Sequence, residues 1–92
     1  ITSINNSLVV ETNKLKQKKY RQINQQFIVE GLHLVEEAYQ AGVLDMVFCL
    51  EKPSFTDVET YIVSEDIIKK LSDVKSHQGI IGVCRDWSDP DQ

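Results

Sequence analysis

The sequence predicts an α/β domain, built as a three-layer α/β/α sandwich around a four-stranded mixed sheet. Residues 44–50 (LDMVFCL) are almost continuously apolar, which is typical of a strand that helices bury on both faces. Segments with helical and strand patterns follow one another in the order α-β-α-β-β-α-β, which fits a layered α/β fold. The length of 92 residues allows one domain with a single modest core.

The first helix is predicted to begin at the polar run 5–7 (NNS), because short polar side chains accept hydrogen bonds from the first N–H groups of a helix. It is predicted to end near Gln17. Its buried stripe is predicted to consist of Ile4, Leu8 and Leu15. We expect a linker after this helix, in which Tyr20 and Ile23 provide apolar anchors.

The central part of the chain predicts a strand, a tight turn, a helix and a second strand. Three strong strand formers within residues 27–30 (FIVE) come directly before Gly31. The helix is predicted over about residues 32–41, ending at Gly42 in the left-handed conformation that glycine adopts readily. Its buried stripe is predicted to consist of Leu34, Val35 and Ala38. The apolar strand at 44–50 follows.

The last part of the chain predicts a polar loop at 51–59, a strand near 60–63, a helix and a strand at 79–85. Ser64 is expected to cap the helix, whose acids precede its lysines in the order that the helix dipole favours. The predicted core includes Phe27, Val29, Leu34, Val35, Val47, Ile62, Ile68, Leu71, Ile81 and Val83.

The charge of the chain is unevenly distributed. The formal net charge is −4, yet residues 1–29 carry five basic and one acidic side chain, whereas residues 30–92 carry five basic and thirteen acidic ones. Half of the Lys and Arg residues lie in one short segment, at Lys14, Lys16, Lys18, Lys19 and Arg21. Because surface fields reach only about 8 Å at physiological salt, an acidic chain can still present a local anion-binding surface. The alternative is a solvated helix face.

The sequence carries no local signature of catalysis or of metal binding. Cys49 and Cys84 lie in apolar runs without a nearby Cys or His partner, so we expect buried free thiols in a reducing, cytoplasmic compartment. His33 and His77 lack metal-ligand spacing, and neither a P-loop nor a GxGxxG motif is present. No apolar stretch approaches the ~20 residues of a membrane span. We therefore assign no catalytic residue and no metal ligand, and we expect no membrane contact.

Two further positions have two interpretations each. Glu30 ends an apolar strand, so its carboxylate needs a partner or water. A structural ion pair or hydrogen bond to a cation such as Arg21 is one interpretation, and a general base is the other. His77 and Gln78 precede Gly79 at a loop tip, where they form either a plain turn or a pair of hydrogen-bonding groups for a ligand.

An ordered set of motifs in the chain resembles the N-terminal substrate-binding domain of SpoU-type (TrmH-like, SPOUT superfamily) RNA 2′-O-ribose methyltransferases. The resemblance covers about residues 2–85. It is carried by Ser3-x-x-Asn6, Leu15-x-x-Lys18-Lys19-Tyr20-Arg21, Phe27-x-Val29-Glu30-Gly31, Leu34-Val35-x-x-Ala38, Val63-Ser64, Leu71-Ser72-Asp73 and Gln78-Gly79-Ile80. The family often has Pro before the Gln-Gly pair, where this chain has His77.

The resemblance implies a fold like that of kink-turn-binding ribosomal proteins and a role in holding rRNA or tRNA. It implies that a separate C-terminal domain binds S-adenosylmethionine and transfers the methyl group. The expected organisation is an RNA-binding domain at 1–86, with 87–92 as the start of a linker to a catalytic domain that this chain lacks. The chain itself is then non-catalytic and without cofactor. Its expected partners are RNA, its own catalytic domain and a second copy in a homodimer.

The predicted RNA-binding residues are Lys14, Lys18, Lys19, Tyr20, Arg21, His77 and Gln78, while Glu30 and Gly31 form a structural motif. Lysine and arginine would contact phosphates, and Arg21 is the best bidentate phosphate partner among them. Tyr20 either stacks on an unpaired base or packs within the protein. Two alternatives stay open, namely a protein-interaction module that supports assembly with the catalytic domain, and a stand-alone RNA-binding protein of the ribosomal kind.

Overall fold

The structure is a computed structural model that describes residues 6–53, 57–72 and 78–85. These residues form the predicted strands and helices and one additional helix. The elements are α1 (Ser7–Lys14), α2 (Lys18–Asn24), β1 (Gln26–Glu30), α3 (Leu32–Gln40), β2 (Leu44–Cys49), β3 (Glu59–Ile62), α4 (Glu65–Leu71) and β4 (Ile80–Arg85).

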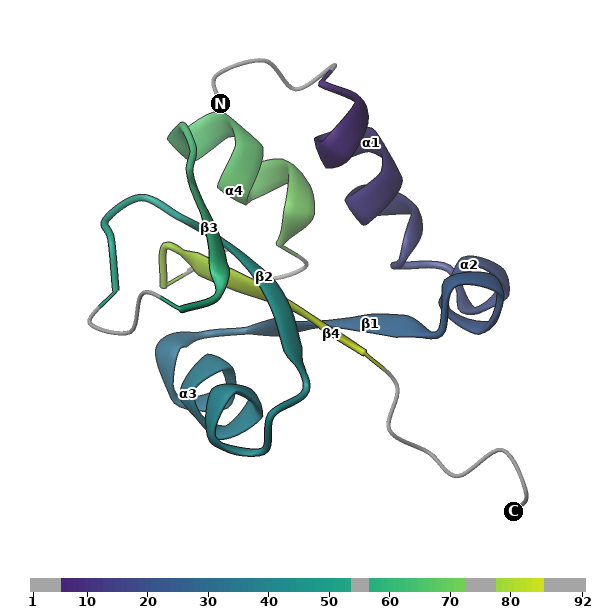
Figure 1. Ribbon diagram of the computed structural model, residues 1–92. Helices are drawn as coiled ribbons and strands as arrows, with labels where there is room; N and C mark the ends of the chain where they lie inside the picture. Colours follow the sequence, from purple (N-terminus) through teal and green to yellow (C-terminus); the bar gives the residue numbers. More distant parts are fainter. Residues whose placement is uncertain (1–5, 54–56, 73–77, 86–92) are drawn as a thin grey trace.

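The four strands form one mixed sheet in the order β1-β4-β2-β3 (Figure 1). β4 is antiparallel to both of its neighbours, whereas β2 and β3 are parallel, so the predicted mixed sheet is confirmed. Gly82 lies in the middle of β4, and a Cβ atom there would approach the Leu44 side chain at 2.9 Å and the Val29 and Val35 side chains at 3.1 Å. The absence of a side chain at Gly82 therefore lets α3 pack directly against the central strand.

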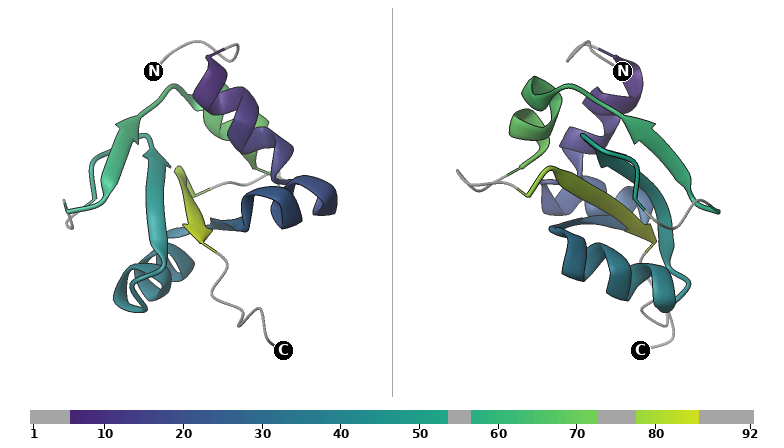
Figure 2. Two further views of the ribbon diagram at one scale, coloured as in Figure 1. Left: turned by 45° about the vertical axis from the view of Figure 1, so that its right-hand side comes forward. Right: turned by 90° about the vertical axis from the view of Figure 1, so that its left-hand side faces the viewer.

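Helices cover both faces of the sheet, with α3 on one face and α1 and α4 on the other (Figures 1 and 2). Alternate side chains of β2 point to opposite faces of the sheet. Val47 and Cys49 pack toward α3, whereas Phe48 packs toward α1 and α4. The register is irregular between Leu44 and Met46, which places these two side chains on opposite faces. The strand is buried on both sides, as its apolar run predicts.

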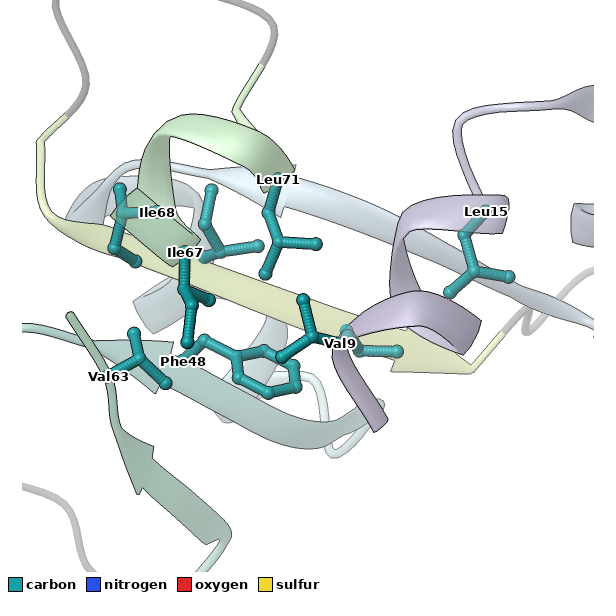
Figure 3. Packing of buried hydrophobic residues seen from close by; sticks show 9 residues of the cluster. Val9, Leu15, Phe48, Val63, Ile67, Ile68 and Leu71 are labelled. Atoms are coloured by element: carbon teal, nitrogen blue, oxygen red, sulfur yellow. The ribbon is translucent and has the colours of Figure 1, made fainter. Parts of the chain in front are cut away.

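Phe48 lies at the centre of the larger cluster, which joins α1 and α4 to the sheet (Figure 3). Val9 of α1 and Ile67 of α4 reach it from the helices, and all three side chains have no exposed surface. The Phe48 ring also stacks on Tyr61 of β3, with ring centroids 5.5 Å apart. Burial of each such side chain stabilises the fold by about 1.5–3 kcal/mol, so this cluster fixes α1 on the sheet.

The N-terminal region departs from the predicted helix and linker. α1 ends at Lys14, and residues 18–24 form α2 instead of a linker. The break occurs at Gln17, whose backbone is extended (φ −97°, ψ 132°) although no Gly or Pro marks the position. Of the predicted buried stripe, Leu15 is buried and Leu8 packs partly buried against the same cluster, whereas Ile4 lies outside the described residues. Val9 and Thr12 are the buried residues within α1, and the prediction did not include them.

Two predicted core residues are wrong. Leu34 is 46 % exposed because α3 turns Val35 and Ala38 toward the sheet, which leaves Leu34 at the side of the helix. Ile62 is 48 % exposed because β3 is an edge strand whose Tyr61 points inward. Apolar spacing alone does not distinguish a buried helix face from its flank.

The predicted helix ends are confirmed in two cases and corrected in one. The Asn6 side chain accepts a hydrogen bond from the Leu8 N–H at 2.9 Å at the start of α1. Gly42 follows α3 with a φ of 75°, as expected of a left-handed residue. Ser64 occupies the N-cap position of α4, but its side chain makes no capping hydrogen bond, and its buried oxygen has no partner within the described residues.

Candidate nucleic-acid interface

The basic segment, residues 14–21, forms the junction between α1 and α2. It lies at the end of the sheet where β1 begins (Figure 1). Its chain turns sharply at residues 15–17, where three successive N–H groups donate to the carbonyl oxygens three residues before them, at 3.0–3.2 Å. Gln25, in the left-handed conformation with φ 53°, then directs the chain from α2 into β1. The local turns therefore place the basic side chains at one end of the molecule.

Arg21 holds this junction together from within. Its Nη1 donates to the carbonyl oxygen of Lys16 at 2.9 Å and to that of Leu15 at 3.2 Å. These carbonyls follow the last turn of α1, where a helix leaves oxygens without intrahelical partners. The guanidinium is half-buried and connects α2 to the end of α1. Arg21 thus has a structural role that charge counting does not reveal.

Lys16 also points toward the protein. Its Nζ donates to the carbonyl oxygen of Lys70, near the end of α4, at 2.6 Å. A cation at the carbonyl end of a helix is also favoured by the helix dipole. The sequence gives no signal for this contact, because the two residues are 54 positions apart. The basic segment is therefore tied to α4 as well as to α1.

The remaining cations face outward and form the outer basic group, which we define as Lys14, Lys18, Lys19 and Tyr20. The Nζ atoms of Lys14 and Lys19 lie 5.5 and 5.6 Å from the centroid of the Tyr20 ring. Such cation–π contacts contribute roughly 0.5–1 kcal/mol at exposed sites. Lys18 and Lys19 are exposed, and Lys14 forms an exposed ion pair with Glu11 at 3.2 Å. Two cations are thus arranged around one aromatic ring.

Gln78 lies elsewhere, at the start of α3. Its Oε1 accepts a hydrogen bond from the Leu32 N–H at 3.2 Å, which satisfies one of the first N–H groups of this helix. Gly31 precedes the helix with φ 96° and ψ 148°, and a Cβ atom there would lie 3.0 Å from the same Oε1. Gly31 and Gln78 are therefore one structural unit, and Gly31 forms the predicted tight turn.

The chain matches, over residues 6–82, the family described as MRM3-like substrate binding domain. The chain belongs to this family. It is a substrate-binding domain of a family of RNA 2′-O-methyltransferases, so the resemblance identified in its motifs is confirmed.

Relatives with known names agree with this assignment. The chain is 31 % identical over 90 residues to the 23S rRNA (guanosine(2553)-2′-O)-methyltransferase RlmP of Bacillus subtilis, covering 91 % of this chain and 36 % of RlmP. Among solved structures, an RNA 2′-O ribose methyltransferase matches with a TM-score of 0.81 and 29 % identity, over 94 % of this chain and 37 % of the other. An AdoMet-bound rRNA methyltransferase from Sinorhizobium meliloti matches with a TM-score of 0.77 and 25 % identity, over 92 % and 35 %. This MRM3-like domain thus spans little more than a third of the length of these relatives.

The MRM3-like domain brings some of the predicted site residues together and separates others. The outer basic group and Arg21 share one end of the molecule, next to Gln26 at the start of β1. Gln78 lies at the opposite end of β1, since Glu30 there pairs with Ile81. His77 is outside the described residues. The two predicted contact regions therefore lie at opposite ends of one strand.

Both cysteines of the domain are buried free thiols, as the sequence predicts. Burial raises the pKa of the Cys49 thiol, and burial together with the Asp45 carboxylate raises the pKa of the Cys84 thiol to about 11. The described ranges contain no group of three His, Cys, Asp or Glu residues that could hold a metal ion. In the same ranges, no helix has the length and apolar character needed to cross a membrane.

Proposed function

We propose that this domain holds the RNA substrate of a 2′-O-ribose methyltransferase, with the outer basic group as its phosphate-binding surface. The observation that carries this proposal is the arrangement of Lys14 and Lys19 around Tyr20, beside the exposed Lys18, in a chain that is otherwise acidic. Phosphate contacts supply affinity without sequence information. The RNA is rRNA or tRNA, and the family assignment supports this choice of partner.

The outer basic group suits single-stranded RNA. Lysines bind phosphates as mobile point charges, and an aromatic ring between them can stack on an unpaired base. The ion pair between Lys14 and Glu11 is exposed on both sides, so it opposes phosphate binding by Lys14 by less than about 1 kcal/mol. Arg21 contributes to phosphate binding through its remaining N–H groups, which do not donate to the carbonyl oxygens of Leu15 and Lys16.

Methyl transfer belongs, in this proposal, to a separate catalytic domain that binds S-adenosylmethionine and follows the linker at 87–92. The glycine turns at Gly31 and Gly79 leave no space that would cradle that cofactor. A Cβ atom at Gly31 would meet the Gln78 amide at 3.0 Å, and one at Gly79 would meet the Leu50 side chain at 3.3 Å, so side chains already fill both turns. The partners of the domain are then RNA, its catalytic domain and, in the whole protein, a second copy.

The salt dependence of RNA binding tests the proposal. Lys18→Ala and Lys19→Ala should each weaken binding of the 92-residue chain to a single-stranded RNA on the order of fivefold, equally for all sequences. Each should also flatten the log–log salt slope by about 0.7, because one phosphate contact with its counterions is lost. Fluorescence anisotropy with labelled oligonucleotides between low and physiological salt measures both quantities.

Lys69→Ala is the matched control, since Lys69 is an equally exposed lysine on α4, outside the basic segment. It should change neither affinity nor slope. If Lys18→Ala and Lys69→Ala behave alike, or if binding does not depend on salt, the outer basic group is a solvated surface. The protein-interaction alternative would then be preferred.

A further inference from the structure

A further cation lies at the same end of the molecule as the basic segment. Arg85, the last residue of β4, pairs with Gln26, the first residue of β1. Gln26 directly follows Gln25, the residue at which α2 ends. The end of β4 therefore lies beside the end of α2 (Figures 1 and 2). The rise of a helix and the spacing of paired strands place the Cα atoms of Lys18 and Arg85 no more than about 20 Å apart.

Asp45 holds the Arg85 guanidinium in one orientation. The Nε of Arg85 donates to Asp45 Oδ1 at 3.1 Å, and Nη2 lies 2.9 Å from the same oxygen. The Arg85 side chain is nevertheless 59 % exposed, whereas that of Asp45 is only 25 % exposed. Nη1 has no partner within the described residues, so its two N–H groups remain available. Arg85 is thus an oriented cation with unused donors at the surface.

The acids beside Arg85 are already paired. The Nε2 of Gln26 donates to Asp45 Oδ2 at 3.2 Å, so both oxygens of this carboxylate have donors. Glu11, which lines a small hollow together with Gln26, forms its ion pair with Lys14 at 3.2 Å. A phosphate at Arg85 would therefore meet carboxylates whose charge is partly neutralised.

A strip without acids joins Arg85 to the outer basic group. Residues 12–29 contain no Asp or Glu, although the chain has 14 acidic residues. The last part of α2 and its C-cap present the exposed amides of Gln22, Asn24 and Gln25, whose side chains have no hydrogen-bond partner within the described residues. Amides both donate and accept hydrogen bonds, so they can contact the phosphates and sugars of RNA. The strip therefore connects two cationic positions through neutral polar groups.

We propose that Arg85 binds a phosphate of the same RNA strand that the outer basic group holds, an inference that rests on the proposed RNA-binding function. The unused N–H groups of an oriented guanidinium form strong, charge-assisted hydrogen bonds to phosphate oxygens. A strand that contacts both Lys18 and Arg85 crosses the exposed end of α2. The linker to the proposed catalytic domain follows Arg85, so this path leads the RNA toward that domain.

The alternative role of Arg85 is a purely structural ion pair that joins β4 to β2. The two roles predict different results for Asp45. If Arg85 binds phosphate, the Asp45 carboxylate competes with the phosphate, and its removal should strengthen RNA binding. If the ion pair is only structural, its removal should leave RNA affinity unchanged or lower it through a loss of stability.

The test measures binding of a labelled all-uridine heptamer to the 92-residue chain by fluorescence anisotropy at several salt concentrations. Arg85→Ala should weaken binding on the order of fivefold and flatten the log–log salt slope by about 0.7. Arg85→Lys should keep most of the slope, because it keeps the charge. Asp45→Asn should strengthen binding about threefold, and this gain should disappear in the double variant Asp45→Asn/Arg85→Ala.

Glu36→Gln removes an exposed carboxylate on α3 and is the control for the change in net charge, so it should leave the affinity almost unchanged. Circular dichroism of each variant shows whether it is folded at the temperature of the binding measurement. If Arg85→Ala is not folded, the comparison between Asp45→Asn and Glu36→Gln decides, because equal affinities for these two overturn the Arg85 site.

Two further results overturn the Arg85 site, namely a folded Arg85→Ala variant that binds like the unmodified chain, and a gain in Asp45→Asn that persists without Arg85. If Lys18→Ala still weakens binding and flattens the salt slope in that case, the proposed function stands and the RNA path ends at the outer basic group. If the chain binds no oligonucleotide, both proposals are overturned.

Discussion

Residues of the same charge have different roles in the basic segment. The cationic groups of Lys16 and Arg21 donate to backbone carbonyls, whereas Lys18 and Lys19 point into solvent. A guanidinium can serve two carbonyls from one nitrogen and keep further donors for a ligand, which an ammonium does less well. The net charge of the segment is therefore a poor measure of its phosphate-binding capacity, and single substitutions are needed to separate the roles.

The glycine before α3 gives the first residue-scale prediction. Gly31→Ala should lower the free energy of unfolding by about 2–4 kcal/mol, because its φ of 96° with ψ of 148° lies in a region that is essentially restricted to glycine. The added Cβ atom would also press on Gln78 Oε1 at 3.0 Å and weaken its hydrogen bond to Leu32 N–H. Urea denaturation followed by circular dichroism measures the loss.

Gly42→Ala is the control for this substitution. Gly42 also has a positive φ, 75°, but a Cβ atom there would have no neighbour within 4 Å. Gly42→Ala should therefore lower the free energy of unfolding only by the penalty for a left-handed backbone, about 1–2 kcal/mol. Equal losses for the two variants would show that the contact between Gly31 and Gln78 adds nothing to stability.

At the scale of elements, the sequence predicts the strands closely and the N-terminal helices poorly. The strands could be predicted because each is a short apolar run bounded by glycine or polar residues, as at Gly31 and Gly79. The division between α1 and α2 could not, since Gln17 and Gln25 adopt non-helical backbone conformations without being residues that favour them. Contacts between the two helices, chiefly the hydrogen bonds of Arg21 with the end of α1, offset the cost of these unfavourable backbone conformations.

The candidate site shows the same limit. Composition locates the basic segment, because five of the ten Lys and Arg residues lie within it. Periodicity does not reveal which cations point outward, since the helix is interrupted between Lys14 and Lys18. Glu30 lines the same hollow as Leu15 and Arg21, and this placement depends on how α2 and β1 pack, which no local pattern encodes. The sequence thus indicates the segment, and the fold determines the roles within it.

The junction between α1 and α2 gives the element-scale prediction. Arg21→Ala should lower the free energy of unfolding by about 1–3 kcal/mol, because hydrogen bonds from a charged donor to two backbone carbonyls are lost in a half-buried place. Arg21→Lys should lose much of the same stability while it keeps the charge. Denaturant unfolding and RNA anisotropy on the same samples measure the two effects.

Lys18→Ala is the control, because this exposed side chain on the same helix should change stability by less than about 0.5 kcal/mol. A structural role for Arg21 predicts that Arg21→Lys is destabilised although it still binds all-uridine RNA. If neither Arg21 variant changes stability, the two carbonyl contacts contribute nothing, and Arg21 is free to act on phosphate alone.

At the scale of the whole molecule, the two sides of the sheet differ in chemistry. Aliphatic and aromatic side chains pack on both sides, but both cysteines lie on the side of α3. Asp45 lies on β2, where its carboxylate forms an ion pair with Arg85 at 2.9 Å and raises the pKa of the Cys84 thiol. The stability of the α3 side is therefore coupled to pH in the alkaline range.

The last prediction follows from this coupling. Burial raises the pKa of Cys84 from 9.0 to about 11, so the unfolded chain loses the thiol proton at lower pH than the folded chain. The free energy of unfolding should keep its full value below pH 9, because the Cys84 thiol is then protonated in both states. It should fall progressively between pH 9 and pH 11, by about 2–3 kcal/mol in total. The raised pKa values of Cys49, Tyr39 and Tyr61 act in the same direction. Denaturant unfolding at pH 7, 9, 10 and 11 under reducing conditions measures the loss.

Cys84→Ala, which removes the titrating thiol, is the control. It should be less stable at pH 7, but its free energy of unfolding should decline less steeply with pH. Parallel declines of the two proteins would show that Cys84 does not titrate within the core.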